Sequence, residues 1–72
     1  MSMKYVINDS GNVAVGPEST FHADLLESIG GRLESAAQYQ VNDGKVSTFG
    51  QSYGFGTVPR PEDAEIIQRH LQ

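Results

Sequence analysis

The first part of the chain alternates between apolar segments and turn-forming clusters. Residues 4–7 (KYVI) are rich in β-branched and aromatic side chains, which are typical of strands. Residues 8–12 (NDSGN) favour a turn. An extended pattern resumes over residues 13–15 and ends at the Gly-Pro pair 16–17. The pattern predicts a first β-hairpin.

An apolar stripe with helical spacing follows this hairpin. Phe21, Leu25 and Ile29 recur at every fourth position, which predicts an amphipathic helix. We expect the hydroxyl of Ser19 or Thr20 to cap its N-terminus. The glycine pair after Ile29 should end the helix, because glycine tolerates the left-handed conformation at a helix C-terminus.

The next segment has the period of a strand. Apolar and polar residues alternate over residues 33–41, which predicts a half-buried strand. The Asn-Asp-Gly run at 42–44 is a strong signal for a tight hairpin turn. Residues 45–49 would then return as the partner strand, with Val46 and Phe49 as its buried anchors.

The C-terminal segment predicts a second helix that starts at about Pro61. Proline is favoured at the first helical position. Acidic residues gather at the start of this segment and basic residues near its end, as the helix dipole favours. Ala64, Ile67 and Leu71 form the expected buried stripe.

These elements, in the order ββαββα, predict an α+β fold in which two helices pack on one face of a small antiparallel sheet. The 72 residues allow one domain, over residues 1–72, in which 1–3 are expected to be an added or disordered start. Chains this short bury little surface, and this one has no cysteine for a disulfide. Oligomerisation is the remaining way to gain stability, so we expect a homo-oligomer.

Composition narrows the functional classes. The net charge of −4 disfavours binding to a DNA or RNA polymer, but it does not exclude one small anion held by one basic residue. No apolar run approaches the ~20 residues of a membrane span, so we expect a cytoplasmic protein without membrane contact. His22 and His70 lack ligand spacing, so no metal is expected. No catalytic motif is present, and we expect neither a cofactor nor an enzyme.

The segment 50–56 is the most unusual part of the chain. Its three glycines expose backbone N–H groups and permit close approach of a ligand. Gln51 and Ser52 add side-chain hydrogen bonds, while Tyr53 and Phe55 add flat faces on which a base can stack, worth ~1–3 kcal/mol each. The alternative is a glycine-rich edge and loop whose aromatic residues belong to the core.

Arg60 stands between two prolines just before the predicted second helix. A helix N-terminus favours an anion, and a guanidinium beside it can bind a phosphate through two parallel hydrogen bonds. The alternative is that Arg60 pairs locally with Glu62 or Asp63 as a cap. The candidate ligand-binding residues are therefore Gln51, Ser52, Tyr53, Phe55 and Arg60.

The residues Gly50-Gln51-Ser52, Phe55 and Arg60-Pro61-Glu62-Asp63-Ala64 resemble a widespread family of very small bacteriophage proteins. Members carry a G-E-S-x-S-L segment and then S-R-P-E-D-A at the same spacing. This chain departs from that pattern at Gln51, Gly54 and Pro59, where the family has Glu, Ser and Ser. The last change removes a hydroxyl that would cap the final helix.

That family is similar to the anti-CBASS cyclic-nucleotide sponges. The resemblance implies a non-catalytic immune-evasion protein, active in the host bacterial cytoplasm during phage infection. It would sequester a cyclic nucleotide second messenger in a site shared between the subunits of a homo-oligomer. Arg60, Ser52 and glycine-loop amides would bind phosphate, and Tyr53, Phe55 or Tyr39 would stack on the bases. Two alternatives stay open: a phage protein that inhibits a host protein by direct binding, and an enzyme acting on a small nucleotide.

Overall fold

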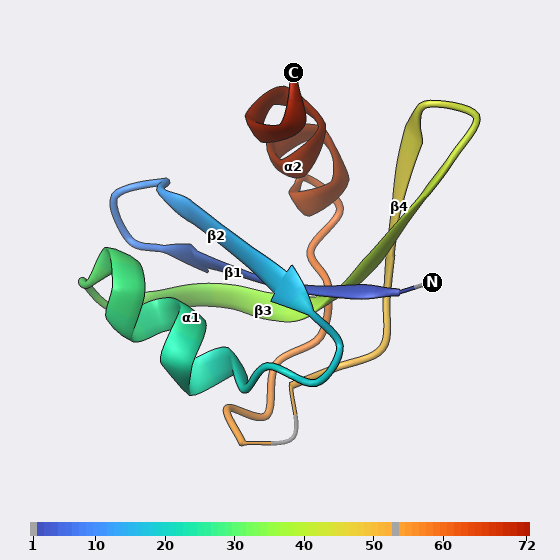
Figure 1. Cartoon of the computed structure of the whole chain (residues 1–72). Helices are drawn as coiled ribbons and strands as arrows, with labels where there is room; N and C mark the ends of the chain where they lie inside the picture. The colour runs from blue at the N-terminus through green and yellow to red at the C-terminus, as the bar shows by residue number, and fades with distance from the viewer. Residues whose placement is uncertain (1, 53) are drawn as a thin grey trace.

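The computed structural model describes residues 2–52 and 54–72. Within these residues four strands form one antiparallel sheet in the order β2-β1-β3-β4, accompanied by two helices (Figure 1). The predicted α+β class and the order ββαββα are confirmed. The elements are β1 (Met3–Asn8), β2 (Val13–Pro17), α1 (His22–Ile29), β3 (Leu33–Asn42), β4 (Lys45–Phe49) and α2 (Asp63–Leu71).

The two helices cover opposite faces of the sheet, so the prediction that both pack on one face is wrong (Figure 1). Tyr5 and Ile7 of β1 pack with Ile67 of α2, whereas Val6 packs with Leu25 of α1. Successive residues of a strand point to opposite faces, so this apolar run supplies a core on each side. A continuous apolar run is the signature of a strand buried on both faces.

The β3 strand divides in the same way. Ala37 and Tyr39 are buried on the side of α2, and Ala36 is buried on the side of α1. From Ala36 onward the even-numbered residues of β3 therefore share the face that carries α1, and Leu33, beyond the register shift, packs on that face as well. The strand β1 begins at Met3, which packs against the core on the side of α2 and so belongs to the fold.

The start of α1 differs from the expectation. The backbone N–H of Thr20 donates to the carbonyl of Pro17 (2.9 Å) in a turn, which places both predicted caps before the helix. Phe21 takes the N-cap position instead, and no side chain caps this end. Phe21 is also 71% exposed, so its prediction as a buried member of the stripe is wrong, and His22 is buried in its place.

The predicted turn between β3 and β4 is confirmed. Asp43 and Gly44 both have positive φ (53° and 78°), as a two-residue hairpin turn requires. Val46 packs against the core on the side of α2. Phe49 lies opposite Gln38 in the register and is 37% exposed, so its prediction as a buried anchor is wrong.

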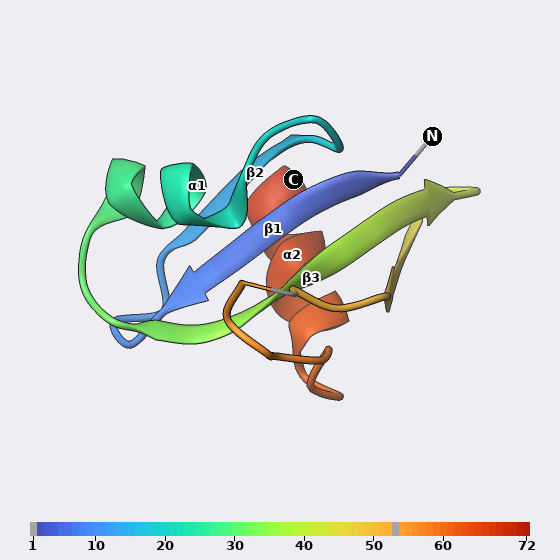
Figure 2. The ribbon, with the colours of Figure 1, turned by 90° about the horizontal axis from the view of Figure 1, so that it is seen from below.

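The connection between β4 and α2 (residues 50–62, the β4–α2 connection) crosses from one face of the sheet to the other. Since β4 is shorter than β3, the first half of β3 has no neighbouring strand on that side. The connection runs along the face of α1 and then returns past this edge to α2 (Figures 1 and 2). Thr57 fastens it there, because its Oγ1 donates to the carbonyl of Ala36 (2.7 Å).

The helix α2 packs through a narrower stripe than predicted. Ile67 is fully buried, Ala64 is half-buried, and Leu71 is 44% exposed, so the prediction that Leu71 is buried is wrong. Ile66 packs beside the core in its place. Neither helix of the described residues is long and apolar enough to cross a membrane.

Candidate functional site

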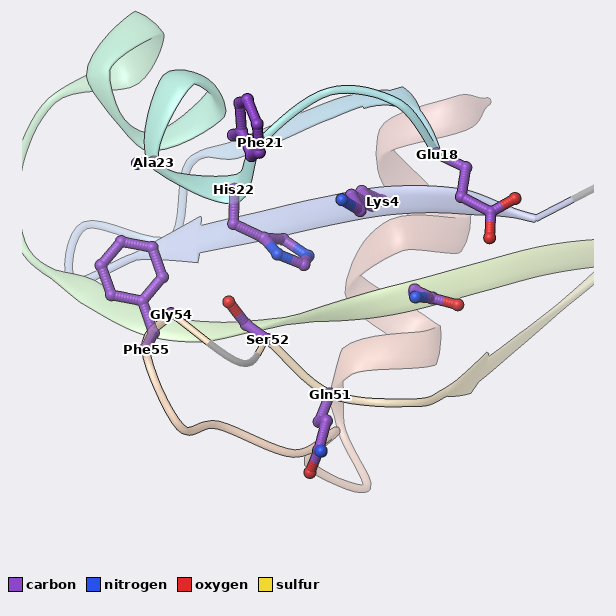
Figure 3. A pocket seen from close by; sticks show the side chains of 10 residues that line it. Lys4, Glu18, Phe21, His22, Ala23, Gln51, Ser52, Gly54 and Phe55 are labelled. Carbon is purple, nitrogen blue, oxygen red and sulfur yellow. The ribbon is translucent and has the colours of Figure 1, made fainter.

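A hollow of about 660 Å³ opens on the face of the sheet that carries α1. The N-terminal end of α1 borders it on one side and the β4–α2 connection on the other, with β1 and β3 between them (Figure 3). We call this hollow the pocket. The pocket exists because α1 covers only part of this face of the sheet, and because the β4–α2 connection crosses the part that α1 leaves uncovered.

Two exposed phenylalanine rings line the pocket. Phe21 is the residue immediately before α1. Phe55 belongs to the turn at the tip of the β4–α2 connection and is 38% exposed. Lys4 Nζ lies 6.0 Å from the centre of the Phe21 ring, within the range of a cation–π interaction. The arrangement offers two stacking faces and a positive charge next to one of them.

His22 and Ser52 are the buried polar residues of the lining. His22 Nε2 lies 2.8 Å from the carbonyl oxygen of Ala37. A carbonyl oxygen only accepts, so Nε2 carries the hydrogen and donates it. This bond fixes the N-terminal end of α1 on β3. The hydroxyl of Ser52 points toward His22 (Figure 3).

The rim of the pocket adds amide and carboxylate groups. Gln38 lies next to Lys4 in the register of β1 and β3, and Gln51 stands at the start of the connection. Glu18 contributes a carboxylate from the segment before α1. The rim therefore offers hydrogen-bond donors and acceptors of the kind that read the edge of a base.

Three predicted site residues meet at the pocket. Gln51, Ser52 and Phe55 all line it, although they come from a segment without regular secondary structure. Tyr53 lies outside the described residues. Arg60 is not part of the lining. The structure therefore brings Gln51, Ser52 and Phe55 together and places Arg60 apart from them.

Arg60 is engaged by acidic side chains. Its Nε donates to Asp63 Oδ1 (2.9 Å) and its backbone N–H to Asp63 Oδ2 (3.0 Å). Nη1 lies 3.4 Å from a carboxylate oxygen of Glu34 and 4.0 Å from one of Glu62. The structure therefore supports the alternative in which Arg60 pairs locally with Asp63, and a phosphate at Arg60 would have to compete with three carboxylates.

Asp63 is fully buried and has four hydrogen-bond donors around it, here called the Asp63 cluster. Besides Arg60, Tyr5 Oη donates to Oδ2 (2.6 Å), and so does Ser35 Oγ. Burial by itself opposes ionisation, but the hydrogen bonds from Ser35, Tyr5 and Arg60 outweigh it and lower the pKa of Asp63. Burial and the bond to this carboxylate raise the pKa of Tyr5. The cluster fixes the start of α2 on β1 and β3.

The lowered pKa of Asp63 makes the protein sensitive to acid. Asp63 binds its proton more weakly in the folded chain than in the unfolded chain, so it contributes stability above its ordinary pKa of 3.8. That stability is lost as the pH falls through the folded pKa. We expect the urea midpoint to fall steadily below about pH 5. Asp63→Asn should flatten this dependence, whereas Glu65→Gln, which changes an exposed acid of α2, should preserve it. Equal pH profiles for wild type and Asp63→Asn would contradict the assignment.

Most of the pocket lining was not predicted from the sequence: besides Gly54, it includes Lys4, Glu18, Phe21, His22, Ala23 and Gln38. Lys4 and Gln38 belong to predicted strands, and Phe21 belongs to the predicted apolar stripe of the first helix. His22 was not predicted as a site residue, and in the structure its Nε2 lies 2.8 Å from the carbonyl oxygen of Ala37. One signal in the sequence concerned Phe21 and His22. Only one of two adjacent residues can face the core at the start of a helix. The apolar stripe assigned this position to Phe21, whereas the structure buries His22.

No family model, curated protein or solved structure matches the chain. Within residues 2–52 and 54–72, no group of three or more His, Cys, Asp or Glu side chains is placed to hold a metal ion.

Proposed function

We propose that the protein binds a cyclic nucleotide in the pocket and sequesters it without turnover. The observation that carries this proposal is the position of Lys4 close to the exposed ring of Phe21, with Phe55 across the pocket. Aromatic rings suit the faces of bases, and an ammonium group suits a phosphate. The resemblance to small bacteriophage proteins adds the biological role, which is evasion of a nucleotide-based immune signal in the host cytoplasm.

The size of the pocket is compatible with this ligand class. Its volume of about 660 Å³ falls in the range of small-molecule sites, ~300–1,000 Å³. Among the described residues, Lys4 is the one Lys or Arg in the lining, whereas a cyclic dinucleotide carries two phosphates. A two-fold ligand of this kind suits a site completed by a second copy of the chain. The proposal therefore includes a homo-oligomer that shares its ligand between subunits.

Direct binding to a host protein is the second candidate. Phe21 and Val58 are both largely exposed apolar side chains (71% and 62%), a feature found at surfaces that meet another protein. This reading requires a macromolecular partner and no nucleotide. A titration with cyclic nucleotides separates this candidate from the first.

Isothermal titration calorimetry against a panel of cyclic di- and trinucleotides tests the proposal. We expect saturable binding of at least one of them and weak binding of linear mononucleotides. Recovery of the intact ligand after denaturing the complex is expected, because the proposal includes no turnover. The absence of binding by every cyclic nucleotide overturns it, as does a hydrolysed ligand.

Phe55→Ala should weaken that binding about tenfold, because base stacking on one ring contributes ~1–3 kcal/mol. Phe49→Ala is the matched control. The two phenylalanines are almost equally exposed (38% and 37%), but only Phe55 is part of the lining. Calorimetry measures the affinities, and circular dichroism shows that both variants are folded. Equal affinities for the two variants would place the ligand elsewhere.

A further inference from the structure

The two edges of the sheet differ in how their backbone groups are covered. The strand order β2-β1-β3-β4 makes β2 and β4 the edge strands. At the β4 edge a side chain of α2 covers the backbone, because Gln68 Oε1 accepts the N–H of Val46 (2.9 Å) and Gln68 Nε2 donates to the carbonyl of Gly44 (2.8 Å). Within residues 2–52 and 54–72, the outer edge of β2 has no such cover (Figure 1).

The register of β1 and β2 shows which backbone groups of β2 face outward. Opposed residues of an antiparallel pair alternate between hydrogen-bonded and non-hydrogen-bonded pairs. The N–H of Asn8 donates to the carbonyl of Asn12 (3.0 Å), which stands opposite it at the end of this register. By alternation, Ala14 bonds to β1, whereas the N–H and C=O groups of Val13 and Val15 point away from β1. The edge of β2 therefore presents two donors and two acceptors.

The sequence of β2 leaves this edge open. Natural sheets protect their edges with charged side chains, a proline or a bulge. Residues 13–17 (VAVGP) contain no charged side chain, and the single proline stands at the end of the strand. A second hollow, of about 420 Å³, is lined by Gly11, Val13, Ile66, Arg69 and His70, so it lies where β2 meets α2. An uncharged edge of this kind is a surface to which another strand can add.

We propose that β2 pairs in antiparallel fashion with β2 of a second copy of this chain, with the two-fold axis at Ala14. The outward groups of the edge are self-complementary about this residue. Val13 lies opposite Val15 of the second copy, and Val15 lies opposite Val13 of the second copy. Each of these two pairs exchanges two N–H···O=C bonds, so the interface has four. A two-fold interface uses the same surface of both subunits, as this edge allows.

The chain itself limits the pairing to these residues. Pro17 has no N–H, and its carbonyl already accepts from the N–H of Thr20 (2.9 Å). At the other end, the N–H of Gly11 donates to the carbonyl of Asn8 (3.0 Å). A longer foreign strand would therefore find no further partners beyond the four bonds that a second copy already makes. This observation favours the second copy as the occupant.

The side chains suit the same arrangement. Val13 and Val15 are half-buried against the core on the side of α2, so Val15 of the second copy would stand beside Val13, at the second hollow. Ala14 lies on the side of α1, where two small side chains would meet at the axis. The register also sets Gly11 of the second copy opposite Pro17, next to Glu18 at the rim of the pocket. The inference goes beyond the proposed function, because it identifies a subunit interface without reference to the ligand.

Sedimentation equilibrium and amide hydrogen exchange of the full chain test this interface. We expect a dimer of about twice the 7.8 kDa mass of the chain. The amides of Val13 and Val15 should be protected from exchange, although they face outward in a single chain. The amide of Thr48 is the internal comparison, since it faces outward on β4, two residues from Val46, and should exchange freely. These measurements use the wild-type chain, so they do not depend on the folding of a variant.

Charges placed at the axis give a second test. Ala14→Glu and Ala14→Lys should each weaken dimerisation by more than about tenfold, because like charges brought face to face at an interface repel. An equimolar mixture of the two variants should form a dimer again, since opposite charges then meet at the axis. Ser47→Glu is the matched control: it adds the same charge at an exposed position of β4 and should leave dimerisation unchanged.

A monomeric wild-type chain overturns the interface, and so does a dimer in which the amides of Val13 and Val15 exchange as fast as that of Thr48. A mixture of folded Ala14→Glu and Ala14→Lys that stays monomeric overturns the axis at Ala14. Protection of these amides only in the presence of a different protein overturns the second copy as the occupant.

The interface and the proposed function fail separately. A dimer paired through β2 that binds no cyclic nucleotide keeps the interface and overturns the proposed function. Binding of a cyclic nucleotide by a homo-oligomer whose Val13 and Val15 amides exchange freely keeps the function and overturns the interface.

Discussion

Asp63→Ala is expected to lower the free energy of unfolding by about 3–5 kcal/mol, the usual effect of removing one partner of a buried ionic cluster. The change leaves the hydroxyls of Tyr5 and Ser35 buried without their acceptor, and it frees Arg60 from its closest partner. Each unpaired buried group costs free energy because water cannot replace the lost bond. A small domain has a total stability of only about 5 kcal/mol or slightly more, so much of the population should unfold.

Urea denaturation followed by circular dichroism measures this effect. Glu62→Ala is the control, because Glu62 is the acidic neighbour of Asp63 but is exposed and lies 4.0 Å from Arg60. An exposed ion pair contributes about 0–1 kcal/mol, so this variant should stay close to wild type. Equal midpoints for the two variants would show that the Asp63 cluster does not hold the start of α2.

This prediction assigns a structural role to the most specific stretch of the sequence. Arg60 and Asp63 both belong to the R-P-E-D-A run that carries the resemblance to bacteriophage proteins. In the folded chain they bond to each other and join α2 to the sheet. The sequence left two readings open because an anion clamp and a local cap use the same residue types at the same spacing. Tyr5 and Ser35, which are distant from Asp63 in the chain, donate to its carboxylate and so favour the local cap.

Local signals predicted most of the secondary structure. The alternation over β3 and the Asn-Asp-Gly turn are determined within a few residues, and both appear as expected. The placement of the helices is not a local property. The run Tyr5-Val6-Ile7 indicates that β1 is buried on both faces, but it does not say which helix covers which face.

One wall of the pocket was predictable because its signal is also local. The composition of the segment 50–56 is unusual by itself, and it led to Gln51, Ser52 and Phe55. Lys4 and Phe21 join them only because the β4–α2 connection crosses the free edge of β3. That crossing depends on the difference in length between β3 and β4 and on the bond from Thr57 to Ala36, which no local pattern reveals.

Ile67→Ala is expected to lower the free energy of unfolding by about 2–5 kcal/mol, the range for truncating a buried isoleucine. Ile67 has no exposed surface and packs against Tyr5, Ile7 and Tyr39 in the core on the side of α2. It is the one apolar side chain of α2 that is fully buried, so the cavity removes the main contact between this helix and the sheet.

Leu71→Ala is the matched control, since it removes an aliphatic side chain of the same size from the same helix. The helical spacing alone predicts equal effects, because Ile67 and Leu71 belong to one stripe. The structure predicts a much smaller effect for Leu71, below about 1 kcal/mol, because this side chain is 44% exposed. Urea midpoints of the two variants decide between these expectations. Because α2 and the pocket lie on opposite faces of the sheet, the folded fraction of Ile67→Ala should bind a cyclic nucleotide as wild type does.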